Sequence, residues 1–159
     1  MYRRVLLAFD GTLEGRTALR EGALLALRCG ADVFLIAVVA DTPGLRAAEG
    51  AYAGAVASVL DRYRPVLDEG VARLTNLGFS PRAKLVLGEP TLEIAAFARE
   101  VGADLVVVSH RRRSLLERWW AGNTGAHLTD HIGCSLLVAR NAIPEAQFEA
   151  ELNRARRDT

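Results

Sequence analysis

Residues 5–12 read VLLAFDGT, and the fold can be worked out from this stretch outward. Residues 5–9 are apolar without strict alternation, which is typical of a strand buried on both faces. Thr12 is a suitable N-cap, and apolar residues recur at helical spacing over residues 12–28, with Gly30 just past the end. The opening of the chain therefore predicts a buried strand followed at once by an amphipathic helix.

The same alternation of strands and helices continues along the chain. Three further apolar runs predict buried strands, and one run that partly alternates predicts a strand near a sheet edge. The buried runs cover residues 33–39, 105–108 and 136–139, and the alternating run covers residues 82–87. Helical spacing predicts helices over residues 45–77, 91–101 and 122–131. Pro65 lies inside the first of these helices, so we expect a kink or a break there.

This order predicts an α/β, doubly wound architecture: a five-stranded, mostly parallel sheet with helices on both faces, as in Rossmann-like folds. A chain of 159 residues with 50% hydrophobic content fills one core. We expect one domain over residues 1–140 and a tail over residues 141–159. Within the tail, residues 143–157 have the pattern of a short amphipathic helix, with Phe148 and Leu152 four apart. That helix could pack on its own domain, pack on a partner subunit, or fray.

Composition sets few demands on partners. The charged fraction is 25% and the formal net charge is +1, so neither nucleic acid nor a membrane surface is an expected partner. No apolar run approaches membrane-spanning length, and we expect a cytoplasmic protein. Cys29 and Cys134 lie far apart without a CxxC spacing, so we expect two buried thiols rather than a disulfide or a zinc site.

Polar residues follow the predicted strands at the ends where ligands bind in parallel sheets. Asp10 follows the first strand, Val38 lies near the end of the second, and Ser109 follows the fourth. Asp10 could contact a ligand or cap the first helix, and these two readings are about equally supported. Val38 could simply end a buried strand. The sequence therefore predicts any ligand site at this edge of the sheet.

Several stretches, taken in order, resemble the universal stress protein family. They are VLLAFDGT at residues 5–12, Gly88-Glu89-Pro90, residues 102–108 and residues 114–140. The resemblance implies a fold like that of the adenine nucleotide α-hydrolases and a homodimer formed through the last strand. It also implies that Asp10 contacts the nucleoside part of a nucleotide and that Val38 offers its backbone to the adenine ring.

Members of this family that bind ATP carry a glycine loop after the fourth strand: glycine, two residues, glycine, nine residues, then glycine with a small hydroxyl or amide residue. Here Ser109 and Arg112 replace the first two glycines, whereas Gly122-Asn123 keeps the end of the pattern after nine residues. Glycine lets the backbone approach phosphates without a Cβ in the way, so these replacements weaken the expectation of ATP binding. The candidate residues of this loop are Ser109, Arg111, Arg112, Gly122, Asn123 and Thr124.

Three functions remain open from the sequence. The first is a dimeric binding and signalling module in stress response, with a protein partner and with weak or no ATP binding. The second is a protein that binds ATP or AMP, with magnesium, and uses Arg111, Arg112 and Arg113 for phosphate contacts. The third is a nucleotide-hydrolysing enzyme, for which Asp10 is the only carboxylate at the expected place.

The remaining chemistry-bearing residues carry weaker hypotheses. No nucleophile elbow, complete Walker A loop or dinucleotide glycine fingerprint occurs, so we expect no enzyme. His127 and His131 are four apart on a predicted helix, which alone is a weak metal signal. Trp119 and Trp120 are expected to pack in the core or anchor a loop.

Overall fold

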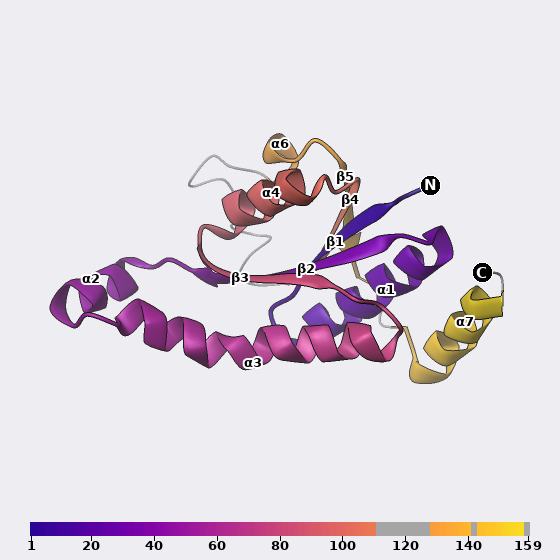
Figure 1. Ribbon diagram of the computed structural model, residues 1–159, viewed down its shortest axis with the longest axis horizontal. Coiled ribbons are helices and arrows are strands. Elements are labelled where there is room, and N and C mark those ends of the chain that lie inside the picture. Colours follow the sequence, from indigo (N-terminus) through magenta and orange to yellow (C-terminus); the bar gives the residue numbers. More distant parts are fainter. Residues whose placement is uncertain (111–127, 141–142, 158–159) are drawn as a thin grey trace.

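The computed structural model of the chain describes residues 1–110, 128–140 and 143–157 (Figure 1). Its five strands form one sheet in the order β3-β2-β1-β4-β5, and every pairing is parallel. The strands are β1 (Arg4–Ala8), β2 (Asp32–Ala40), β3 (Arg82–Gly88), β4 (Leu105–Ser109) and β5 (Ser135–Ala139). The predicted α/β, doubly wound sheet is confirmed, including the placement of residues 82–87 at an edge. β5 is the other edge strand.

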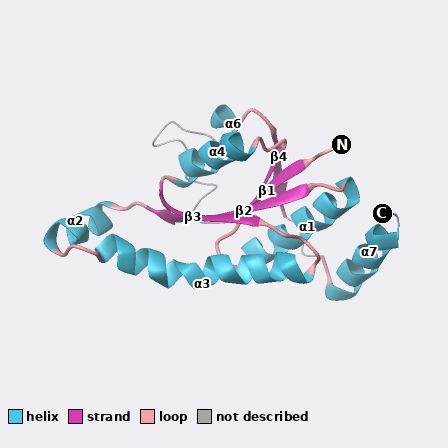
Figure 2. Ribbon diagram, in the orientation of Figure 1, coloured by secondary structure: helices cyan, strands magenta, loops and turns pink. Residues whose placement is uncertain are grey.

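Helices cover both faces of this sheet (Figure 2). They are α1 (Leu13–Cys29), α2 (Pro43–Ala51), α3 (Ala55–Asn76), α4 (Pro90–Val101), α6 (Leu128–His131) and α7 (Glu145–Arg157). One face carries α1 and α3, and the other carries α4 and α6. Neighbouring residues of β1 divide accordingly: Leu7 packs in the cluster with α1 and α3, whereas Leu6 packs in the cluster with α4. The buried core is therefore two apolar layers separated by the sheet.

Local sequence accounts for the ends of the first helix. Thr12 Oγ1 accepts a hydrogen bond from Gly15 N at 3.0 Å, which makes Thr12 the N-cap of α1 as predicted. Gly30, with φ 61°, ends the helix in the left-handed conformation that glycine adopts most readily. These caps direct the chain from β1 into α1 and back to β2.

The predicted helix over residues 45–77 is in fact two helices, and the break is not at Pro65. α2 ends at Ala51, and α3 begins after Gly54, whose φ of 101° suits glycine. Pro65 lies inside α3 on its exposed side, where water can bond the carbonyl that the missing N–H leaves free. α2 and the first turns of α3 extend past the carboxyl ends of β2 and β3 (Figure 1).

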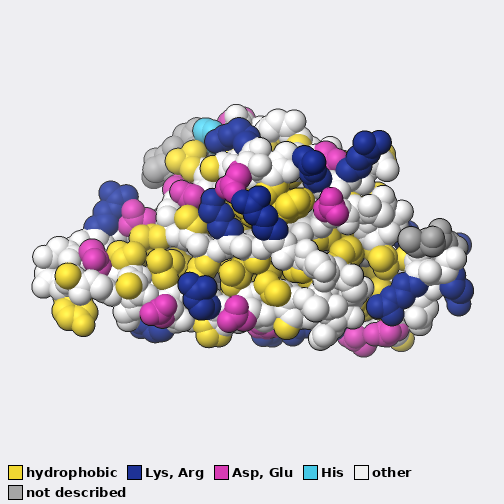
Figure 3. Space-filling view, viewed as in Figure 1, with side chains coloured by type: hydrophobic (Ala, Val, Ile, Leu, Met, Phe, Trp, Pro, Cys, Tyr) yellow, Lys and Arg dark blue, Asp and Glu magenta, His cyan; other side chains and the backbone are white. Residues whose placement is uncertain are grey.

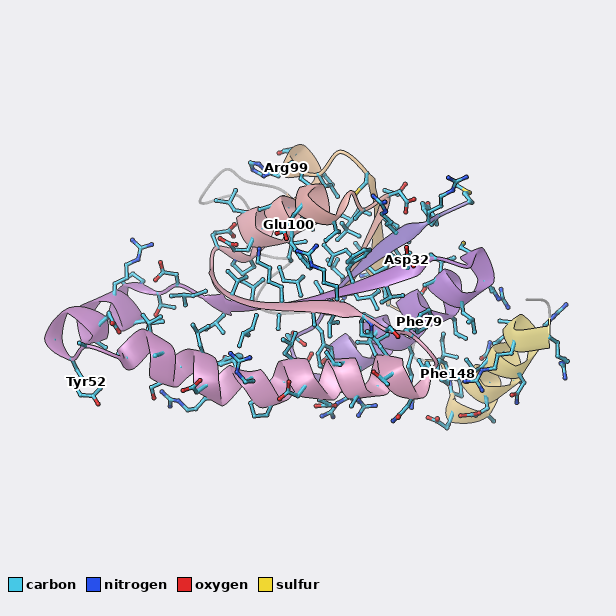
Figure 4. All side chains as sticks on the ribbon, in the orientation of Figure 1. Asp32, Tyr52, Phe79, Arg99, Glu100 and Phe148 are labelled. Carbon is cyan, nitrogen blue, oxygen red and sulfur yellow. The ribbon has the colours of Figure 1, made fainter. Side chains whose placement is uncertain are left out.

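The tail forms α7, which packs on the domain itself. Phe148 and Leu152 are buried against Leu24 of α1, and Figure 4 shows Phe148 where α7 faces the rest of the molecule. The Arg20 guanidinium lies 5.2 Å from the centre of the Phe148 ring. Glu151 forms an ion pair with Arg28 across the helices. The tail is thus attached by an apolar contact with ion pairs around it.

The two cysteines are less buried than the sequence predicted. Cys29 and Cys134 are unpaired as expected, but both are partly exposed rather than buried. Partial burial raises the pKa of the Cys134 thiol.

Within the described ranges of the chain, no helix combines the length and apolarity needed to cross a membrane.

Candidate functional site

A cavity of about 260 Å³ opens at the carboxyl edge of the sheet. Its floor comes from the ends of β1, β2 and β4, and its sides come from α3 and α4. The lining residues are Ala8, Phe9, Asp10, Thr12, Ile36, Val38, Ala40, Tyr63, Pro90, Ile94, Val108 and Ser109. The cavity therefore lies where a doubly wound sheet is expected to bind its ligand.

Asp10, Val38 and Ser109 were predicted as site residues, and all three line this cavity. They come from three neighbouring strands, because β2, β1 and β4 are adjacent in the sheet. Residues separated by up to 99 positions in sequence thus share one surface. The other predicted site residues lie outside the described residues: Arg111, Arg112, Gly122, Asn123 and Thr124. Trp119, Trp120 and His127 also lie outside them.

The Asp10 carboxylate is held at the start of α1. Its Oδ1 accepts hydrogen bonds from Thr12 N at 3.0 Å and from Thr12 Oγ1 at 2.5 Å. A Cβ on Gly15 would lie 2.4 Å from the same oxygen, so the absence of a side chain at Gly15 makes room for the carboxylate. Asp10 is therefore not the N-cap of α1, which is Thr12, but it holds Thr12 in place and also lines the cavity.

The turn between β3 and α4 brings Pro90 and Ile94 to the cavity. Glu89 is the N-cap of α4 and accepts a hydrogen bond from Leu92 N at 2.8 Å. A Cβ on Gly88 would lie 2.6 Å from Glu93 Cγ, so glycine permits the close approach of the strand end to the helix. This turn is one of the segments that carry the family resemblance.

Sequence reasoning missed Tyr63 as a site residue. Its helical period with Leu67 had placed it on the inward face of a helix, which the buried Leu67 of α3 bears out. However, α3 runs past the sheet, so Tyr63 lies over the carboxyl edge, lines the cavity and stays 43% exposed. The available signal was the combination of an inward-facing aromatic and a helix longer than the strands.

The electrostatics of this edge come from few groups. Among the residues that line the cavity in the described structure, only Asp10 carries a carboxylate. Asp41 follows β2, and its Oδ2 accepts a hydrogen bond from Arg46 Nε at 2.8 Å, which lowers the pKa of that carboxyl. The acidic side chain nearest the end of β2 is therefore neutralised by its own arginine.

A metal site is not apparent in the residues that the structure describes: no group of three or more His, Cys, Asp or Glu side chains is placed to hold an ion.

Figure 3 shows acidic and basic side chains mixed over the face that includes β3, with hydrophobic side chains gathered along α3. Arg82 and Lys84 of β3 form ion pairs there with Glu100, which Figure 4 labels on α4.

Known proteins resemble this chain over most of its length. A putative universal stress protein of Staphylococcus epidermidis is 25% identical over 154 residues, which cover 95% of this chain and 92% of the relative. A solved structure from the universal stress protein family of Burkholderia pseudomallei is 29% identical, with a TM-score of 0.62, and the match covers 86% of this chain and 95% of that one.

A universal stress protein of Archaeoglobus fulgidus, solved in complex with dAMP, shares the fold with a TM-score of 0.60 at 19% identity; 87% of this chain and 98% of that chain are covered. The model of the Universal stress protein family matches residues 1–140. The match spans the whole sheet, the turn at Gly88 and the strand ends that line the cavity. This chain belongs to the universal stress protein family.

Proposed function

We propose that this protein binds an adenine nucleoside monophosphate at the carboxyl edge of its sheet, binds ATP more weakly, and acts as a homodimeric binding module rather than as an enzyme. The observation that carries the proposal is that Asp10, Val38 and Ser109 line one cavity. The resemblance assigns these positions to nucleotide contacts. The A. fulgidus relative, which shares the fold, is described in complex with dAMP.

The apolar part of the cavity suits a nucleobase. Ile36, Ile94 and Val108 form an apolar surface next to Val38, whose backbone groups can read the edge of a ring. Tyr63 lies across the cavity from α4 and can stack on the same ring, because an aromatic side chain accepts any base as a stacking partner. The base then lies between α3 and α4, with Asp10 next to the sugar.

The size and charge of the cavity favour a short phosphate chain. Its volume of about 260 Å³ is below the ~300–1,000 Å³ of pockets that enclose drug-sized ligands, so it holds a nucleoside and leaves the phosphate at the rim. Magnesium fits poorly into the described lining, since Asp10 is its single carboxylate and already accepts two hydrogen bonds. Any Mg²⁺ would therefore be held mainly by the phosphates of a bound triphosphate.

Ligand-dependent stabilisation tests this function. AMP at one hundred times its Kd raises the free energy of unfolding by about 2.7 kcal/mol, and the melting temperature rises with it. Asp10→Ala should abolish the rise, whereas Asp32→Ala, which removes a carboxylate at the opposite edge of the sheet, should keep it. Equal melting curves with and without millimolar AMP, ADP or ATP and magnesium would refute nucleotide binding.

The proposed dimer rests on the free edge of β5. Ser135 N donates to Asp104 O at 3.2 Å and Ala139 O accepts from His110 N at 3.0 Å, so these residues direct their backbone groups toward β4. Backbone groups alternate along a strand, and the N–H groups of Leu136 and Val138 therefore face away from β4. An edge with free donors can pair with the same edge of a second copy.

Sedimentation of two matched variants tests the dimer. Val138→Pro removes an outward N–H without removing a bond to β4, and should convert a dimer into a monomer. Val138→Ala shortens the side chain but keeps the donor, and should remain dimeric. A wild-type monomer at tens of micromolar, or a Val138→Pro dimer as tight as wild type, would refute pairing through β5.

A further inference from the structure

A histidine and an arginine lie together just past the ends of β4 and β5. Arg140 Nη2 is 2.6 Å from His110 Nε2, and His110 N donates to Ala139 O at 3.0 Å. Ser109 pairs with Ala139 in the sheet, so His110 and Arg140 continue the register of the two strands by one residue. A guanidinium can only donate hydrogen bonds, and His110 Nε2 is therefore the acceptor. The histidine thus orients the arginine.

The pair lies beside the cavity and on the same face of the sheet. Val108 lines the cavity and packs in the cluster that contains Ile94 of α4. Side chains alternate along a strand, so His110 follows Val108 on the α4 face. Val138 belongs to the same cluster, and Arg140 follows it in the same way. Both side chains therefore extend the α4 side of the cavity toward β5.

The strand order gives the carboxyl edge a direction. Val38, Asp10, Ser109 and Arg140 belong to or follow β2, β1, β4 and β5, which are consecutive in the sheet. Adjacent strands are about 4.8 Å apart, so this row spans three steps, or about 14 Å. A nucleotide laid along it with its base at Val38 and its sugar at Asp10 brings its phosphate toward β4 and β5.

This row contains two opposite charges, on Asp10 after β1 and on Arg140 after β5. Arg140 is exposed, and in the described parts of the chain no carboxylate lies within ion-pair distance of it. The carboxylate of Asp10 lies at β1, where it already accepts hydrogen bonds from Thr12. A guanidinium without an acidic partner, oriented by a neighbour, is suited to a phosphate because its N–H groups match two phosphate oxygens.

We propose that Arg140, oriented by His110, binds the phosphate of the nucleotide and so forms an anion subsite at the ends of β4 and β5. The inference rests on the proposed function, since it places the phosphate of the ligand whose nucleoside occupies the cavity. It moves the main phosphate contact away from a loop that has lost two of its glycines, Ser109 and Arg112 standing in their place. Arg140 touches the ligand in this arrangement, and His110 is a positioning residue.

Calorimetric titration of the full chain with AMP and with adenosine separates the subsite from the nucleoside site. Arg140→Gln should weaken AMP binding by about tenfold to a hundredfold, the range for a lost charge-assisted hydrogen bond, and leave adenosine binding unchanged. Arg140→Lys, which keeps the charge but not the planar fork, should lose part of the AMP affinity. His110→Ala should weaken AMP binding less than Arg140→Gln does. Arg3→Gln, the same loss of charge at the amino edge of the sheet, should change neither affinity.

Each other outcome overturns a specific claim. If wild type binds AMP and Arg140→Gln binds it equally well, the subsite is wrong and the nucleotide site stands. If Arg140→Gln weakens adenosine as much as AMP, Arg140 supports the fold of the site and does not hold the phosphate. If wild type binds neither compound, the proposed function fails and the subsite fails with it.

Discussion

Replacing Gly15 by alanine tests whether the Asp10 carboxylate lies where the structure places it. The new Cβ would lie 2.4 Å from Asp10 Oδ1 and 3.2 Å from Thr12 Oγ1, so the carboxylate must move away. Such a movement lengthens the two hydrogen bonds that Asp10 accepts from Thr12, now 3.0 and 2.5 Å. Gly15→Ala therefore weakens the contact between Asp10 and Thr12, the N-cap of α1.

The expected magnitude combines two opposing effects. Alanine in place of glycine stabilises a helix by up to about 1 kcal/mol. An intact hydrogen bond to a charged group contributes about 1.5–3 kcal/mol, and lengthening two partly exposed ones loses part of this, about 2–3 kcal/mol together. Gly15→Ala should thus lower the free energy of unfolding by about 1–2 kcal/mol. Gly50→Ala in α2 is the matched control, because a Cβ there meets nothing within 4 Å and the variant should gain up to about 1 kcal/mol.

Urea denaturation followed by circular dichroism measures both variants by linear extrapolation. The double variant Asp10→Ala/Gly15→Ala completes a cycle, and in the Asp10→Ala background the substitution of Gly15 should no longer destabilise. Equal stabilisation by Gly15→Ala and Gly50→Ala would refute the clash. A destabilisation that persists without the Asp10 carboxylate would show that Gly15 is needed for a different reason.

Three further predictions concern Tyr63, the tail and an ion-pair network. Tyr63→Ala should weaken AMP binding by about 1–3 kcal/mol in calorimetry, because the stack on the base is lost. Two controls should bind AMP as wild type does: Tyr63→Phe, which keeps the ring, and Tyr52→Ala at the exposed α2–α3 turn (Figure 4). A Tyr63→Ala variant that binds AMP as tightly as wild type would contradict stacking. Phe148→Ala should destabilise the fold by about 3–5 kcal/mol in urea melts, and a cost as small as that of Leu92→Ala, at an exposed site, would mean that α7 is not docked. Arg16 and Arg73 donate to Glu69 at 2.7 and 2.8 Å and lower the pKa of its carboxyl, Arg16 most. A carboxyl whose pKa is lower in the folded state stabilises the fold above the unfolded pKa of about 4.3, and this stabilisation is lost as the pH falls through the folded pKa. Glu69→Gln should therefore lower the free energy of unfolding by at most about 1 kcal/mol at pH 7 and leave it unchanged well below pH 4. A loss that does not depend on pH, or one equal to that of Glu149→Gln at an exposed position of α7, would contradict this prediction.

The fold was predictable because its signals are local and repeated. Each buried strand shows an apolar run, and the ends of α1 are marked by Thr12 and Gly30. The break between α2 and α3 was not predictable from Pro65, because a proline on the exposed side of a helix loses only one hydrogen bond. Gly54, with its positive φ just before α3, was the better signal, since glycine adopts that conformation readily where the chain turns between two helices.

The candidate site was predictable only in part. Asp10, Val38 and Ser109 could be found because the ends of buried parallel strands meet at one edge. The partnership of His110 with Arg140 could not, because it depends on β4 and β5 being adjacent and in a fixed register. Pairing between strands that are far apart in sequence is a property of the folded sheet.

Tyr63 shows why a family resemblance and a structure give different parts of a site. The resemblance is carried by residues that the backbone requires, such as Gly11, which has φ 75°, and Gly88, which lies against Glu93. Such positions fix where the strand ends and helix starts lie, and so fix the floor of the cavity. The side of the cavity that α3 forms depends instead on how far α3 runs past the sheet, because a helix rises about 1.5 Å per residue and the side chain over the cavity changes with its length. Ligand preference within this fold should therefore vary with α3 and with the residues after β4 and β5, while the Asp10 end of the cavity keeps its geometry.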